Sequence, residues 1–163
     1  MKTRYMLAAL LIASASVSSL VSAATYTGQT RHNGSMCTIR GSQGASAESC
    51  LSLTGNGAMN RCSYPITIVC PMMFDWATGY DMVGMSIYNP NPDTNPVKAR
   101  VIWQDNASWY WGACPTTTSP SRGATFLFPD VCGPDNFWAD YYALEVVLPT
   151  YNSRVYGYQP RAN

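Results

Sequence analysis

The stretch Tyr141–Tyr158 reads YYALEVVLPTYNSRVYGY and holds the longest two-residue alternation in the chain. Successive side chains of a β-strand point to opposite faces, so this alternation predicts a strand over 139–148. One face would carry Tyr142, Leu144, Val146 and Leu148, and the other Tyr141, Ala143, Glu145 and Val147. Pro149 ends the strand because it has no N–H to donate to a neighbouring strand.

The residues after Pro149 predict a second strand that folds back on the first. Thr150 to Ser153 form the expected turn, and a second alternation then runs over 154–159. In it, one face would carry Arg154, Tyr156 and Tyr158, and the other Val155 and Gly157. A β-layer therefore closes the chain, and the earlier strands must pack against it.

Short alternating segments divided by Pro- and Gly-rich turns precede this layer. In one of them Val97, Ala99, Val101 and Trp103 are expected to point inward, and 114–123 is expected to be an exposed loop. No window carries a sustained helical period. The predicted strands are 64–73, 81–88, 97–104, 108–113, 125–128, 139–148 and 154–159. This pattern predicts an all-β fold, an antiparallel β-sandwich of immunoglobulin-like or jelly-roll-like type, stabilised by disulfides.

Residues 1–23 have the pattern of a secretory signal peptide. Lys2 and Arg4 supply the positive charge, an apolar segment starts at Met6, and Val21-Ser22-Ala23 forms a small-x-small cleavage site. The apolar segment is shorter than the roughly 20 residues that a membrane span needs. We therefore expect a secreted or periplasmic protein with no membrane association once the signal is removed.

The charge balance argues against nucleic acid as a partner. The 10 Lys and Arg of the chain become eight without Lys2 and Arg4, against nine Asp and Glu. No cluster of basic residues is available to form a phosphate-binding face. Asn, Ser, Thr and Gln supply the polar surface instead.

All six cysteines follow the signal peptide: Cys37, Cys50, Cys62, Cys70, Cys114 and Cys132. An even number in an exported chain predicts disulfide bonds. Zinc is not expected, because the chain has no Cys-x-x-Cys pair and only one histidine. The preferred pairing joins Cys114 to Cys132 and distributes Cys37 and Cys50 between Cys62 and Cys70.

The chain divides into an arm and a domain. Residues 24–61 are rich in Gly, Ser, Thr and Asn, and the segment is too long to be an unstructured loop of a compact domain. We expect an N-terminal arm, 24–61, held by its cysteines, with short strands near 35–40 and 49–53. The β-sandwich domain would then span 62–163.

Four short motifs resemble those of a family of small exported proteins from myxobacteria and other proteobacteria, whose function is not known. They are Asn-Gly-Ser-Met-Cys ending at Cys37, Ile-Val-Cys-Pro ending at Pro71, Tyr-x-Leu-x-x-x-Leu-Pro ending at Pro149, and the segment 153–158. Together they cover residues 33–158 in order. The resemblance implies a β-sandwich and export, and it implies no catalytic residue or ligand.

The chain departs from that family at two positions. Val101 and Val146 stand where family members usually carry cysteines, and both fall on inward faces. A paired loss of two cysteines, filled by two valines, would keep the core packed. It suggests that 97–104 and 139–148 face each other across the sandwich.

No catalytic constellation is evident in the sequence. His32, the only histidine, has no local carboxylate to orient it, so a solvated turn residue is favoured over a general base. Most acidic residues are expected in turns, such as Asp93, Asp130 and Asp135 after their prolines, where Asp caps backbone N–H groups. Glu145 is instead expected to face outward from its strand opposite an Arg or Lys, rather than to act as a catalytic acid. Calcium at the oxygen-rich turns 91–95 or 130–135 is a minor alternative, and no cofactor or metal is predicted.

Aromatic side chains give the one compositional signal of binding. Trp109, Tyr110 and Trp111 place two indoles on one face of a predicted strand, where they would offer a platform for sugar rings or protein. Packing in the core or along the strand is favoured over a binding platform for both indoles, and Trp103 is expected in the core.

Three functions remain open from the sequence. The leading hypothesis is a non-catalytic exported module that binds a glycan or a protein surface. The second is a structural subunit that self-assembles into an extracellular fibre or coat, with the N-terminal arm adding a strand to a neighbour's sheet. The third, a secreted hydrolase, lacks a convergent acid, base and nucleophile.

Overall fold

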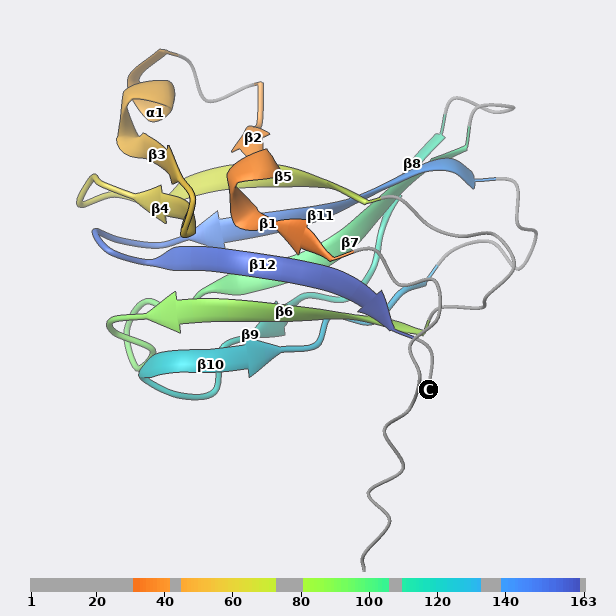
Figure 1. Ribbon diagram of the computed structural model, residues 1–163. Helices are drawn as coiled ribbons and strands as arrows, with labels where there is room; N and C mark the ends of the chain where they lie inside the picture. The colour runs from red at the N-terminus through yellow and green to blue at the C-terminus, as the bar shows by residue number, and fades with distance from the viewer. Residues whose placement is uncertain (1–30, 42–44, 73–80, 106–109, 133–138, 162–163) are drawn as a thin grey trace, which may run out of the picture.

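The computed structural model describes residues 31–41, 45–72, 81–105, 110–132 and 139–161 and forms two antiparallel sheets packed face to face (Figure 1). The order in sheet A is β10 (Gly123–Leu127), β6 (Met82–Asn89), β12 (Arg154–Arg161), β4 (Gly57–Asn60) and β3 (Leu51–Thr54), with β1 (His32–Asn33) also paired to β12. The order in sheet B is β2 (Thr38–Ile39), β5 (Ile66–Met72), β11 (Ala139–Leu148), β7 (Lys98–Asp105) and β8 (Tyr110–Ala113), with β9 (Thr117–Thr118) also paired to β7. The predicted disulfide-stabilised antiparallel β-sandwich is confirmed.

Strand β11 is the centre of sheet B, between β5 and β7. It has the predicted bounds and ends before Pro149, and the turn that follows places Asn152 at a φ of 70°. Leu144 lies opposite Cys70 of β5 and Val101 of β7, so the inward face of all three strands is apolar. Burying this face supplies the main driving force for the packing of the two layers.

The inward and outward faces of β7 also follow the prediction. Ala99 and Val101 are buried, and Trp103 packs partly buried against the core. A Cβ at Gly112, which pairs with Trp103 across β8, would lie about 2.1 Å from the indole. The indole therefore lies over a position where only glycine fits.

The prediction that 97–104 and 139–148 face each other across the sandwich is wrong. The two strands, β7 and β11, are hydrogen-bonded neighbours in sheet B, with Val101 opposite Leu144 and Val146 opposite Ala99. Both valines point inward as expected. Two strands that both point side chains into the core can be neighbours in one sheet or can lie in opposite sheets, so the inward pattern alone does not decide between them.

Strand β12 contains a β-bulge. Val155 lies opposite Ile87 of β6, but Gly157 is the residue opposite Ser86, so Tyr156 is the extra residue. A bulge shifts the alternation by one, and Tyr158 therefore points into the sandwich. The prediction that Tyr158 shares a face with Arg154 and Tyr156 is wrong for this reason.

Residues of the predicted arm supply strands to both sheets. β1, β3 and β4 belong to sheet A and β2 belongs to sheet B, so the chain crosses between the layers through the 3-10 helix η1 (Gly34–Met36). Short strands near 35–40 and 49–53 match β2 and β3. The short helix α1 (Ala45–Cys50) and the strand β9 within the expected loop 114–123 were not predicted.

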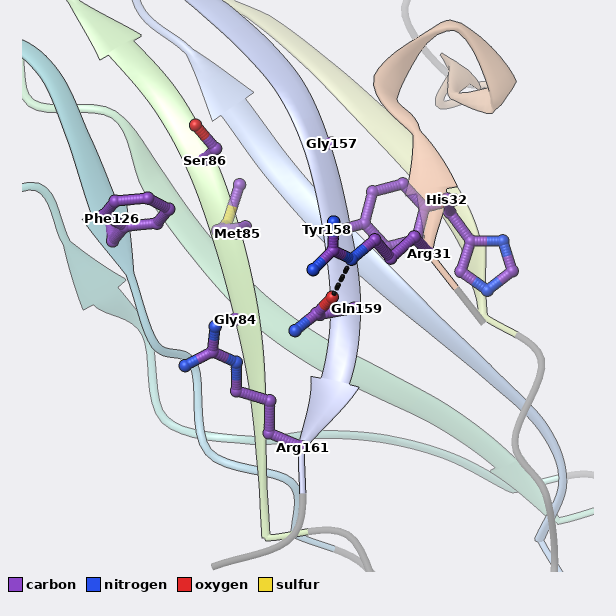
Figure 2. Close-up of a pocket in the computed structure, with 10 residues that line it drawn as sticks. All are labelled: Arg31, His32, Gly84, Met85, Ser86, Phe126, Gly157, Tyr158, Gln159 and Arg161. Carbon is purple, nitrogen blue, oxygen red and sulfur yellow. Dashed lines mark hydrogen bonds between the residues drawn. The ribbon is translucent and has the colours of Figure 1, made fainter. Parts of the chain in front are cut away.

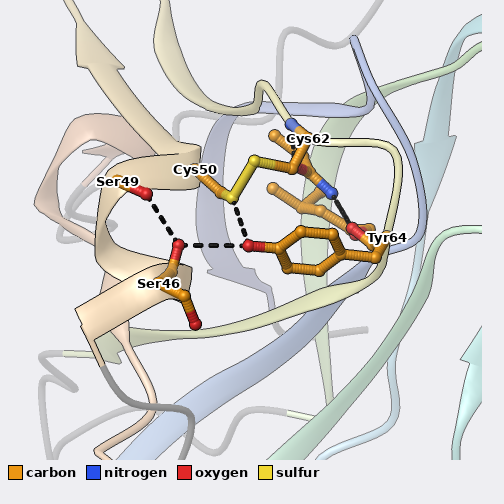
Figure 3. The surroundings of a disulfide bond; sticks show 7 residues. Ser46, Ser49, Cys50, Cys62 and Tyr64 are labelled. Carbon is orange, nitrogen blue, oxygen red and sulfur yellow. Dashed lines mark hydrogen bonds between the residues drawn. A yellow bond between two sulfur atoms is a disulfide. The ribbon is translucent and has the colours of Figure 1, made fainter.

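The three disulfides join Cys37 to Cys70, Cys50 to Cys62, and Cys114 to Cys132, as the preferred pairing had it. The first fixes the crossing segment to β5. The second ties the end of α1 to the chain after β4 (Figure 3). There, the Tyr64 hydroxyl donates to the carbonyl oxygen of Ser46 at 3.1 Å and lies 2.8 Å from Cys50 Sγ.

Within the described ranges, no helix is long and apolar enough to cross a membrane.

Candidate functional site

A groove of about 360 Å³ lies on the outer face of sheet A, across β10, β6, β12 and β1 (Figure 2). We call it the sheet A groove. Its floor is made by Gly84, Ser86 and Gly157, and its sides by Phe126, Arg31, Gln159 and Arg161. These residues come from segments far apart in the sequence, and the sheet order brings them together.

The floor lies below the surrounding side chains because its residues are small and occupy outward positions of two paired strands, β6 and β12. Gly157 lies opposite Ser86, and Gln159 lies opposite Gly84. A Cβ at Gly157 would approach the carbonyl oxygen of His32 to about 2.9 Å, so glycine is needed for β1 to pair with β12 here. The small residues Ser86 and Gly157 leave open space between Phe126 and the Arg31–Gln159 pair, whereas the Arg161 side chain covers Gly84.

One side of the groove is aromatic. Phe126 of β10 leaves 60% of its surface exposed, and its ring stacks at 6.5 Å from the ring of Phe128. The Arg161 guanidinium carbon lies 5.5 Å from the centroid of Phe128. Large exposed aromatics on a strand carry a solvation cost and commonly mark a contact surface.

The other side is polar and cationic. Arg31 Nε donates a hydrogen bond of 3.0 Å to Gln159 Oε1, and Figure 2 shows this pair facing Phe126 across the floor. Arginine has donors only, so Gln159 must present its oxygen to Arg31, and its amide NH₂ donates to no other described residue. Arg161 runs back along β6, where a Cβ at Gly84 would lie 2.7 Å from Arg161 Nε.

Below the floor, His32 and Tyr158 stack with ring centroids 5.1 Å apart. The Tyr158 hydroxyl donates to the carbonyl oxygen of Pro71 in sheet B at 2.7 Å, which links the two layers. Burial raises the pKa of Tyr158, and the nearby Tyr141 raises it further. Burial also lowers the pKa of His32 from its usual 6.5.

The prediction that His32 is a solvated turn residue is wrong. His32 is only 4% exposed, because β1 pairs with β12 and places the imidazole opposite Tyr158. The local sequence Arg-His-Asn-Gly looks like a turn, and its partner strand lies at the other end of the chain. His32 Nε2 has no hydrogen-bond partner among the residues that the structure describes.

Of the aromatic candidates Trp109, Tyr110 and Trp111, only the side chain of Trp111 is among the described residues, and it does not line this groove. Trp111 is 53% exposed on β8 in sheet B, the opposite layer, so of the expected core or strand packing the core is wrong for this indole. Tyr110 starts β8, and Trp109 lies outside the described residues, as do the side chain of Tyr110 and the turn 133–138. Trp111 therefore stays a candidate for a second surface.

Glu145 lies on the outer face of sheet B, as predicted. It is 5% exposed, and its carboxylate accepts hydrogen bonds from Arg40 and from Arg100 Nε, the latter at 2.6 Å. Two guanidinium groups that bind one carboxylate form a structural ion cluster. Among the described residues, no group of three or more His, Cys, Asp or Glu side chains could hold a metal ion.

Sequence reasoning missed Phe126, Arg31, Gln159 and Arg161. The signal that was available is the alternation Ala124, Phe126, Phe128, which puts two phenylalanines on the face opposite Leu127. That pattern marks an apolar outward face on a strand. Only the pairing of β10 with β6 shows that this face adjoins glycines.

Comparison with known proteins finds a fold likeness and no sequence match. No model of a known protein family matches the chain, and no curated protein matches it. A xylan-binding module, CBM15, superposes with a TM-score of 0.53 and 10% identity, over 83% of this chain and 99% of that one. A second solved structure, a CBM28 carbohydrate-binding module specific for non-crystalline cellulose, has a TM-score of 0.40 and 11% identity over 77% of this chain and 83% of that one. The protein thus shares the β-sandwich fold of the CBM15 module.

Proposed function

We propose that this protein is a non-catalytic, exported glycan-binding module and that the sheet A groove is its binding site. The observation that carries the proposal is the exposed ring of Phe126 beside a floor of Gly84, Ser86 and Gly157. The three disulfides are consistent with an oxidising compartment outside the cytoplasm.

The chemistry of a sugar chain suits this groove. A pyranose ring presents C–H groups on one face, which pack against the negative face of an aromatic ring. Its hydroxyls at the rim need hydrogen-bond partners, which Gln159, Arg31 and Ser86 offer. A groove that is open at the surface accepts an internal stretch of a polymer, whereas an enclosed cavity would accept only a chain end.

The shared fold with a xylan-binding module supports a glycan as ligand, although sequence identity is too low to carry over any residue. The alternative of a self-assembling subunit rested on a free N-terminal arm. In the structure, the strands β1, β2, β3 and β4 of that arm already pair within this chain. A hydrolase is not favoured, since the buried carboxylate of Glu145 is bound by two arginines.

The test compares Phe126→Ala with Trp111→Ala for binding to a panel of soluble plant and bacterial polysaccharides by affinity electrophoresis and calorimetry. A fully covered aromatic side chain buries about 200 Å². Phe126 has 60% of its surface free, and a sugar covering one ring face would bury about half of that. At about 25 cal/mol/Å², the loss is roughly 1.5 kcal/mol, or about tenfold in Kd.

Phe126→Ala is expected to lower affinity about tenfold while Trp111→Ala leaves it unchanged. Both side chains are exposed, so neither change should alter stability by more than about 0.5 kcal/mol. The reverse result would move the site to the outer face of sheet B. Binding to no polysaccharide of the panel would refute the proposed function.

A further inference from the structure

We propose that the sheet A groove selects an acidic glycan, with Arg31 and Arg161 binding the anionic group of a sugar that stacks on Phe126. This preference rests on the proposed function, because it names the class of ligand for the same groove. The anion is a carboxylate of a uronic acid or a sulfate ester, which share the chemistry of an oxygen acceptor with no proton to donate.

The first argument is the balance of donors and acceptors. The sides of the groove carry the two guanidinium groups and the amide NH₂ of Gln159, all of which donate. Gln159 Oε1 already accepts one hydrogen bond from Arg31, and besides its second lone pair the Ser86 hydroxyl in the floor is the other side-chain acceptor, so donors outnumber acceptors in the groove. A neutral sugar hydroxyl also brings a proton that needs an acceptor, whereas a carboxylate brings acceptors only. Arginine is the side chain whose planar fork fits a carboxylate with two parallel hydrogen bonds.

The second argument is that these two arginines have no carboxylate partner among the residues that the structure describes. In the described part of the chain, both ion pairs involve Glu145, on the opposite face of the sandwich. Arg40 and Arg100 are bound there, while Arg31 contacts Gln159 and Arg161 contacts Phe128. Arg161 Nε has no hydrogen-bond partner among the described residues.

The third argument is position. Gln159 and Arg161 are two residues apart on the outer face of β12, a spacing of roughly 7 Å in a strand. Arg31 lies against Gln159, so the amide stands between the two cationic groups (Figure 2). Asp81 adjoins Arg161 through a backbone hydrogen bond of 3.1 Å from its N–H to the Arg161 carbonyl oxygen, and Asp130 pairs with Met82, but neither aspartate lines the groove.

The test uses matched pairs of polymers that differ only in charge. Polygalacturonate and polyglucuronate are each compared with the same polymer after chemical reduction of its carboxylates to primary alcohols. A sulfated galactan is compared with its desulfated form, which distinguishes a sulfate from a carboxylate as the anion. Binding is measured by calorimetry with the wild-type protein and with Phe126→Ala, Arg31→Gln, Arg161→Gln and Arg122→Gln.

We expect at least one acidic polymer to bind about tenfold more tightly than its neutral counterpart, with an affinity that falls as salt is added. Arg31→Gln and Arg161→Gln should each remove most of that preference and leave binding of the neutral form nearly unchanged. Arg122→Gln is the matched control, because Arg122 is exposed just before β10 and does not line the groove. Phe126→Ala should weaken both forms equally.

Different failures have different meanings. Equal binding of charged and neutral forms, with both weakened by Phe126→Ala, would overturn the acidic preference and leave the glycan site standing. An Arg122→Gln variant as damaging as the two groove variants would also overturn it, since the attraction would then be diffuse. Binding of no polymer, charged or neutral, would overturn the preference together with the proposed function.

Discussion

Removing the disulfide between Cys37 and Cys70 should destabilise the fold and weaken the groove together. The bond closes a segment of 33 residues, for which the chain-entropy relation gives about 3.7 kcal/mol at 25 °C. Both sulfurs are fully buried, so Cys37→Ala/Cys70→Ala adds about 1 kcal/mol for the unfilled space. The expected loss in the free energy of unfolding is about 4–5 kcal/mol.

The effect on the groove follows from the position of Cys37. Strand β1 pairs with β12 through only two residues, and Arg31 directly precedes it. Once the crossing segment is no longer tied to β5, β1 can separate from β12 and remove one side of the groove. Affinity for the glycan should therefore fall further than Arg31→Gln alone would lower it.

Urea unfolding followed by tryptophan fluorescence measures the stability, and calorimetry measures the affinity. Cys50→Ala/Cys62→Ala is the matched control, since its segment of 12 residues gives about 2.8 kcal/mol and it lies away from the groove. It should lower stability without lowering affinity. A loss below about 1.5 kcal/mol for Cys37→Ala/Cys70→Ala would show that strand pairing alone holds the segment, and the reasoning would fail.

Three further outcomes are expected. Tyr158→Phe removes the buried hydrogen bond between the layers and should cost about 1 kcal/mol in urea unfolding; an unchanged midpoint would contradict this. Burial lowers the pKa of His32 below 6.5, so the imidazole binds a proton more readily in the unfolded chain than in the folded one. The free energy of unfolding should therefore fall as the pH drops below 6.5. In thermal melts, His32→Phe should flatten that pH dependence. Gly84→Ala would push Arg161 aside at 2.7 Å, so calorimetry should show weaker acidic-glycan binding at nearly unchanged stability; full affinity would exclude Arg161 from the site.

Local patterns predicted the elements of this fold well. The alternation over 139–148 gave the bounds of β11, and that over 97–104 gave the inward face of β7. The disulfide pairing was also accessible, because two of the bonds join cysteines fewer than 20 residues apart. The outward position of Glu145 followed from the alternation, and a basic partner followed from the preference for opposite charges across paired strands.

The groove could not be predicted because its parts are distributed over the chain. Phe126 and Gly84 look like ordinary strand residues until β10 and β6 are seen to be neighbours. His32 gave a turn signal because its partner, Tyr158, is distant in sequence. Pairing between distant strands depends on the packing of the whole core, so it cannot be predicted from a short window of the sequence.

The extra residue in β12, Tyr156, determines which side chains after it face the groove and which face the core. Consider a chain that kept Tyr156 but paired it regularly with β6 instead of forming the bulge. Tyr158 would then lie opposite Gly84, and Gln159 opposite Val83. The side chains of Gln159 and Arg161 would then face the apolar core, and the Tyr158 phenol would be exposed to solvent. One inserted position thus decides whether the side chains after Tyr156 line the groove or enter the core, so insertions and deletions in the last hairpin should be far more damaging than substitutions there.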